Sequence, residues 1–279
     1  MVSLPGDVVE RYERFSLYNS PYPAHDHGCA VDLYPGENGG PAPSPVAGEV
    51  LDTRTVQCPP QSYAVDHDHL ILVDCGDVVA RVLHVDPGVD PGDQVTVGDS
   101  LGTLVRSGFF GRWVDDHIHL GFRDPEQNPY RASGSLPLDL GVSVAAVDWD
   151  GHGEVVETGP THALLDTPTF DGTGFAAVAS DEGLPLDGGL AHYTGGGVLS
   201  PCDGPVSLLD CEVGVATGRD VTWHDVAVRA NGERATGLSL FASQVPFGAK
   251  LVFHEGHEFA VGDAVRVRIA PTADPIRLG

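Results

Sequence analysis

The chain has 279 residues, which is enough for one large domain or for two of ordinary size. Its 40 acidic and 15 basic residues give a net charge of −25, and such a surface repels nucleic-acid phosphates and anionic membranes, so neither is expected as a partner. Acid-rich chains with a single lysine, here Lys250, are typical of proteins from a high-salt cytoplasm, where salt screens the repulsion between like charges.

The cytoplasm is also the location that the rest of the sequence favours. The N-terminal segment has neither a basic start nor an apolar core of useful length, and no apolar run approaches the roughly 18 residues of a membrane span. The cysteines are odd in number and include no C-x-x-C pair, so neither a disulfide framework nor a cysteine zinc site is expected. They are Cys29, Cys58, Cys75, Cys202 and Cys211.

Glycine and proline are frequent, with 36 and 22 residues, and predict a mainly β protein of many short strands joined by turns. A helix is expected only over 6–15, where Val8, Val9 and Tyr12 have helical spacing. Strands are then expected in "CAVDLYP" (29–35), "VAGEVLDTRTV" (46–56), the pair "HLILVDCGDVVARVLHV" (69–85), "QVTV" (94–97), "SLGTLV" (100–105) and "HIHLGF" (117–122).

A change in composition divides the chain near its middle. The stretch "NPYRASGSLPLDL" (128–140) has the composition of a linker or long loop. From residue 142 onward, strands recur at short spacing with Gly or Asp turns, a pattern typical of a sandwich or barrel. We therefore expect two domains, residues 1–137 and 138–279, and no motif indicates what the second one does.

Histidines in the first domain indicate where its chemistry lies. His117 and His119 are two apart in an expected strand, so their imidazoles point to the same face. The segment "HDHGCAVD" (25–32) offers further imidazoles and a carboxylate, and His84 lies in an apolar strand. A catalytic zinc ion takes about three such ligands and keeps one position for water. A lone His84 would be interpreted as a core residue, but three histidine-bearing segments in one β unit favour a metal site.

The order of these segments resembles the lysostaphin- and LytM-type zinc endopeptidases. After the His/Asp segment come "SPVAGEV", "LILVDCGDVVARVLHV", "VDPGDQVTVGDSLGTL" and "HIHLGF", in the order of the family pattern, over about residues 25–124. The resemblance implies a LytM-like β-sandwich or barrel-sandwich hybrid domain. It also implies a hydrolase that cleaves a peptide or another amide with a metal-bound water.

The resemblance assigns a role to each candidate residue. It implies that one zinc ion is bound by Asp32 and His119, with His27 as the third ligand. His84 and His117 would stay off the metal, where they would act on the water as acid–base groups and stabilise the oxyanion formed at the carbonyl. A neutral imidazole suits that proton transfer because its pKa lies near the working pH range.

The first ligand histidine is the point at which the chain departs from the family. There the histidine lies four residues before the aspartate, and this chain has Gly28 at that position. His27 lies five before Asp32, an odd offset that reverses the facing on a strand, so it reaches the metal only through a bulge or a loop. His25 is the alternative ligand. Cys29 is close enough to bind the metal too, although such a thiol more often packs as a small apolar residue.

Two other hypotheses remain open at this point. The first is a binding or structural module that keeps the peptidase fold without catalysis, favoured by the shifted histidine, by the unexplained second β unit and by the expected lack of a secretion signal. The segment "VARVLHV" also lacks the family's aromatic residue before the histidine, which predicts a different substrate groove. The second is a phosphocarrier, with His84 paired to His117 or His119. Attachment of biotin or lipoate is excluded because Lys250 lies outside the matching segment. A further pair, His67 and His69 in "VDHDHL" with its two aspartates, is interpreted as exposed loop.

Overall fold

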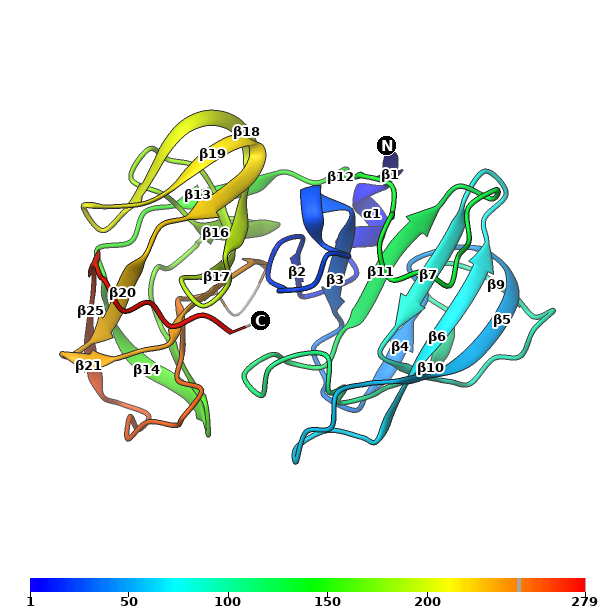
Figure 1. The fold of residues 1–279 in the computed structure, drawn as a ribbon, viewed down its shortest axis with the longest axis horizontal. Coiled ribbons are helices and arrows are strands. Elements are labelled where there is room, and N and C mark those ends of the chain that lie inside the picture. The colour runs from blue at the N-terminus through cyan, green and yellow to red at the C-terminus, as the bar shows by residue number, and fades with distance from the viewer. Residues whose placement is uncertain (245–246, 279) are drawn as a thin grey trace. The chain divides into compact units, whose positions relative to one another are not determined.

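The computed structural model describes residues 1–244 and 247–278. It is built almost entirely of strands, which confirms the predicted fold class (Figure 1). By contacts the chain forms two compact units, the first comprising Met1–Phe15 and Pro23–Val142 and the second Ser16–Tyr22 and Ser143–Gly279. No feature of the sequence indicates that Ser16–Tyr22 belongs to the second unit.

The expected helix over 6–15 is shorter in the structure. The α-helix α1 covers only Gly6–Val9, and the strand β2 (Arg14–Ser16) begins within the predicted range. Phe15 and Ser16 are buried on successive positions, so tertiary packing replaces the helical pattern there. The other helical element in the described part of the chain is the 3-10 turn η1 (Asp26–Gly28).

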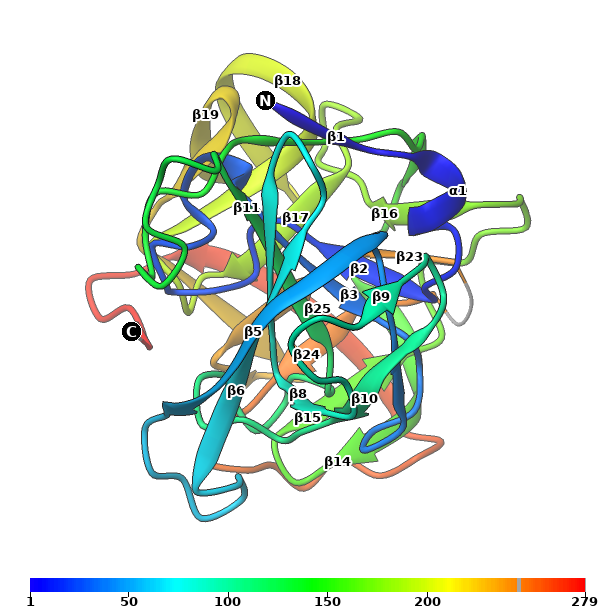
Figure 2. The ribbon, with the colours of Figure 1, turned by 90° about the vertical axis from the view of Figure 1, so that its right-hand side faces the viewer.

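The main sheet of the first unit is antiparallel and contains all the predicted strands of this unit except the one expected over 100–105. Its order is β3 (Ala30–Tyr34), β11 (Ile118–Arg123), β7 (Val79–Leu83), β6 (His67–Asp74), β5 (Gly48–Gln57) and β9 (Gln94–Val95). The long antiparallel pair of β5 and β6 lies in the foreground of Figure 2. A smaller sheet has the order β4 (Pro41–Pro43), β10 (Ser100–Leu104) and β8 (Val85–Pro87), and β1 (Val2–Leu4) pairs with β12 (Leu138–Leu140).

The register of the central strands positions the histidines. His119 on β11 is paired with Asp32 on β3 and with Leu83 on β7. Directly paired residues of antiparallel strands have side chains on the same face. The neighbouring positions, such as Ile118 and Leu120, face the other way and are fully buried. One face of β11 is therefore apolar core, and the opposite face carries the imidazole.

The second unit contains a ten-stranded antiparallel sheet. Its order is β19 (Cys211–Trp223), β18 (Gly195–Leu208), β17 (Leu186–Leu190), β22 (Gly237–Leu240), β24 (Lys250–Val252), β15 (His162–Leu165), β14 (His152–Gly159), β25 (Ala264–Pro271), β20 (Val226–Ala230) and β21 (Glu233–Arg234). The strands β13 (Val144–Val147), β16 (Phe175–Val178) and β23 (Ala242–Ser243) also belong to this unit.

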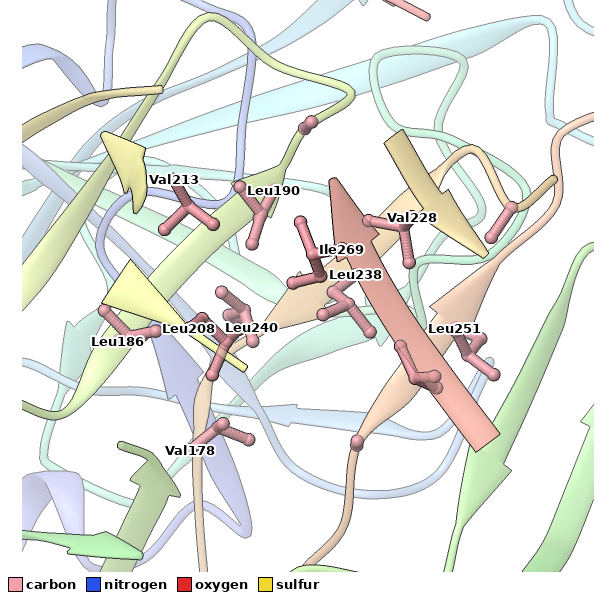
Figure 3. Packing of buried hydrophobic residues seen from close by; sticks show 14 of the residues in the cluster. Val178, Leu186, Leu190, Leu208, Val213, Val228, Leu238, Leu240, Leu251 and Ile269 are labelled. Atoms are coloured by element: carbon pink, nitrogen blue, oxygen red, sulfur yellow. The ribbon is translucent and has the colours of Figure 1, made fainter. Parts of the chain in front are cut away.

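One large apolar cluster forms the core of the second unit. Figure 3 shows side chains from several of its strands that point into a common interior. The labelled members are Val178, Leu186, Leu190, Leu208, Val213, Val228, Leu238, Leu240, Leu251 and Ile269. Burial of so many aliphatic side chains is the main stabilising contribution available to this all-β unit.

A buried carboxylate fixes the segment Ser16–Tyr22 in the second unit. Asp187 on β17 accepts hydrogen bonds from Ser16 Oγ at 2.5 Å, from the Leu17 N–H at 2.6 Å and from the Tyr18 N–H at 3.2 Å. Asn19 then donates through its side-chain amide to Ser239 Oγ at 2.7 Å. These bonds give polar partners to a stretch of buried backbone that the sheet ladder does not satisfy.

None of the described helices has the length and apolar character needed to cross a bilayer. No disulfide joins the cysteines within the described residues.

Candidate metal centre

Three buried side chains of the first unit converge on one point. His119 Nδ1 lies 2.9 Å from Asp32 Oδ1 and 3.1 Å from His25 Nε2, and His25 Nε2 lies 3.3 Å from Asp32 Oδ1. These residues form a group that could hold a metal ion. Donors bound tetrahedrally to zinc at about 2.0–2.1 Å lie roughly 3.3–3.5 Å from one another. A zinc ion therefore fits among these atoms after a small outward shift of the ligands.

Two local features bring these side chains together. Pairing of β3 with β11 places Asp32 directly opposite His119. His25 comes from the loop that precedes η1, outside the sheet. Within that turn His27 and Gly28 both have left-handed backbone angles, with φ of 58° and 62°. The chain reverses there, so His25 ends up buried and His27 exposed.

His25, the alternative, and not the expected His27, is the histidine that the structure brings to Asp32 and His119. A bulge at Gly28 and Cys29 was the expected route by which His27 would face the metal. The turn η1 replaces that bulge, and β3 begins only at Ala30, so the alternating facing of a strand does not extend back to His27. Cys29 is partly buried and is not among the converging ligand atoms.

The two histidines predicted to act beside the metal lie next to the same point. The ring centroid of His84 is 4.9 Å from that of His117 and 5.8 Å from that of His119. His117 Nε2 lies 3.6 Å from Asp32 Oδ2. His117 Nδ1 is 2.8 Å from the backbone carbonyl oxygen of Asp115, which can only accept, so Nδ1 carries the proton and Nε2 is left on the Asp32 side.

His84 reaches this face by a change in backbone direction. It follows the last residue of β7, Leu83, whose side chain shares the face of His119. On a continuing strand His84 would point to the opposite face. Its positive φ of 69° turns the chain and brings its ring round to the histidine cluster.

Burial sets the protonation states of the converging groups. Burial lowers the pKa of His117 to about 4 and that of His119 to about 3, against the opposite effect of the Asp32 carboxylate. Burial alone would raise the pKa of Asp32, but the neighbouring imidazoles hold it well below its ordinary value. Neutral imidazole and ionised carboxylate are the forms that bind a metal cation.

One polar residue of the site lies in a segment for which the sequence predicts an exposed loop. Asp68 is on β6 and is fully buried, with Oδ2 2.5 Å from His84 Nδ1. Of its neighbours in the chain, His67 is exposed and His69 is half-buried. The signal that would have identified it is the period of two that Asp68 shares with Leu70 and Leu72, which places the carboxylate on the same strand face as these buried leucines.

Together these features define a two-domain β protein with a His/Asp centre in its first domain. Residues 3–140 match the family model described as "Domain of unknown function (DUF8155) N-terminal domain", and residues 145–270 match its "C-terminal domain" counterpart. The chain thus carries both domains of this family. No curated protein matches it.

Among solved structures, the NMR solution structure of lysostaphin aligns with a TM-score of 0.28 and 13% sequence identity. The alignment covers 89% of this chain and 96% of that one. A likeness of this size defines neither fold nor activity, so the resemblance to the LytM-type enzymes remains one of motifs.

Proposed function

We propose that the protein is a zinc-dependent hydrolase of a peptide or another amide, with one zinc ion held by His25, Asp32 and His119. The observation that carries the proposal is the convergence of two imidazole nitrogens and a carboxylate oxygen within 3.3 Å of one another. Two further buried histidines adjoin this point, which a purely structural metal site would not need. When bound, the ion would polarise a carbonyl oxygen and make a water molecule more acidic.

The residues off the metal supply the proton chemistry. His117 presents Nε2 to the site because its Nδ1–H donates to the Asp115 carbonyl. It can therefore accept a hydrogen bond from a water molecule and orient it. His84 lies against it with the rings nearly perpendicular, and Phe110 packs on both imidazoles, at centroid distances of 4.6 and 5.2 Å. This aromatic cover excludes bulk water from the reacting groups.

Metal analysis and a mixed-peptide digest test the proposal. Purified wild-type protein should contain about one zinc ion per chain, and His119→Ala should lose it. His117→Ala should keep the zinc but lose cleavage of a mixed synthetic peptide pool, followed by mass spectrometry, by about 100-fold or more. Undiminished zinc in His119→Ala would end the proposal.

A second candidate is a metal-binding module that does not hydrolyse. The observation that favours it is Val82, which stands two residues before His84 where the resembled family has an aromatic residue. Stoichiometric zinc in the wild type, together with an intact peptide pool after prolonged incubation, would support this candidate over the hydrolase.

A further inference from the structure

Asp68 has an unusual number of donors for a fully buried carboxylate. Oδ2 lies 2.5 Å from His84 Nδ1 and accepts from Ser107 Oγ at 2.6 Å, while Oδ1 accepts the backbone N–H groups of His84 and His69 at 3.0 and 2.6 Å. Burial alone would raise the pKa of Asp68, but the imidazole of His84 and these hydrogen bonds hold it well below its ordinary value. The carboxylate is therefore ionised and accepts on both oxygens.

The two contacts with His84 have different effects. The bond to its backbone N–H holds the left-handed residue that turns His84 toward the histidine cluster. The bond to the ring acts on the tautomer, because an ionised carboxylate can only accept. Nδ1 must carry the proton, and the lone pair of the neutral ring is left on Nε2.

We propose that Asp68 is the positioning residue of His84. Its hydrogen bonds to the backbone N–H and to the ring Nδ1 of His84 hold the imidazole so that Nε2 is the nitrogen free to accept a proton at the metal centre. The role of Asp68 in hydrolysis rests on the proposed function, whereas its effect on the tautomer of His84 does not. In this tautomer Nε2 takes a proton from the attacking water as the new C–O bond forms. It returns that proton to the leaving amine nitrogen as the C–N bond breaks.

The partners of the two histidines support a division of labour between them. His117 Nδ1 donates to a neutral carbonyl, that of Asp115, whereas His84 Nδ1 donates to the anionic carboxylate of Asp68. A carboxylate stabilises the imidazolium formed by proton uptake more than a carbonyl does. His84 is therefore the better placed of the two to hold the transferred proton.

Asp68→Asn tests the proposal directly, because the hydrogen-bond donors around residue 68 determine the orientation of the introduced amide. The two backbone N–H groups at Oδ1 need an acceptor, so the amide oxygen takes that place. The NH2 group then faces His84 Nδ1 and donates to it, which moves the ring proton to Nε2. Ser107→Ala is the matched control, since it removes one donor from the same carboxylate without touching His84.

The measurement is a long-range proton–nitrogen NMR correlation of the imidazoles in the full-length, zinc-loaded protein, with His84 assigned by loss of its signals in His84→Gln. We expect Nδ1–H in the wild type and in Ser107→Ala, and Nε2–H in Asp68→Asn, with equal zinc content in all three. For the cleaved peptides, kcat of Asp68→Asn should fall about 100-fold or more with little change in KM.

Two results would overturn the inference. One is an Nε2–H tautomer of His84 in the wild type, which needs no variant to fold. The other is an unchanged tautomer in Asp68→Asn. A protein that holds no zinc or cleaves no peptide would refute the proposed function instead, and the NMR result would still decide whether Asp68 orients His84.

Discussion

His25 Nε2 lies 3.1 Å from His119 Nδ1, although 94 positions separate the two residues in the chain. Both nitrogens also lie within 3.3 Å of one oxygen of Asp32. These buried imidazoles and the carboxylate present their nitrogen and oxygen lone pairs to one point, and a cation there would satisfy all three at once. This arrangement makes binding of a metal ion the first property to measure.

Added zinc should stabilise the wild-type protein against heat. A ligand that binds only the folded state at 100 times its Kd adds about 2.7 kcal/mol to the free energy of unfolding. His25→Ala should abolish the rise in Tm that zinc causes, because it removes one of three ligands. His27→Ala should keep that rise, since His27 is exposed and outside the cluster. Differential scanning calorimetry with and without zinc checks this, and the reverse pattern would restore His27 as the ligand.

The sequence predicted the part of the site that lies within strands. Asp32 and His119 belong to segments whose order and spacing resemble a known family, and their pairing follows from two neighbouring strands. His25 was harder to identify because its place depends on the left-handed angles of His27 and Gly28. Most residues avoid that region, and a single sequence does not show where they enter it.

Asp68 illustrates a second limit of prediction from the sequence. Alternation with leucines marks its facing, but its partner His84 is on another strand and reaches the site only through a backbone turn. In the second unit the individual strands were predictable from alternation. Their order was not, since β17 pairs with β22 and β14 with β25 across long stretches of chain. Such pairings are set by packing of the whole core and leave no local pattern.

Asp187→Ala should destabilise the second unit strongly. The change leaves Ser16 Oγ and the N–H groups of Leu17 and Tyr18 without their acceptor in a buried place. We expect a loss of about 3–5 kcal/mol in the free energy of unfolding, because each orphaned buried donor costs about 1–3 kcal/mol. Asp203→Ala, which removes a single exposed bond to the Gly218 N–H, should cost less than about 1 kcal/mol. Urea titrations of the full-length variants compare the two, and equal losses would contradict the role given to Asp187.

Acid should destabilise the second unit through His192. Burial, with smaller contributions from Arg277 and His254, lowers the pKa of His192 to about 3 from 6.5. Between these values the unfolded chain binds the proton and the folded one does not, so stability falls as pH decreases from 6.5 toward 3. The slope is about 1.4 kcal/mol per pH unit, or about 2 kcal/mol between pH 6.5 and 5.

Urea unfolding of the wild type and of His192→Gln at these two pH values isolates the contribution of this residue. The variant lacks the titrating ring and should lose about 2 kcal/mol less than the wild type over the interval. Parallel losses in both proteins would show that His192 does not remain neutral in the folded state.

The strand β18 contains two glycines, two residues apart, of which we expect one to tolerate substitution by alanine and the other not. A Cβ built on Gly197 would lie 2.2 Å from Tyr18 Cδ2, a ring that is buried against the strand, whereas one on Gly195 would meet nothing nearer than the Val221 carbonyl oxygen at 3.6 Å. Gly197→Ala should therefore cost about 1–3 kcal/mol by overpacking. Gly195→Ala should be neutral or slightly stabilising, because it only restricts the unfolded chain. Denaturant midpoints of the two variants test the contact, and equal tolerance would mean that the ring of Tyr18 does not lie on Gly197.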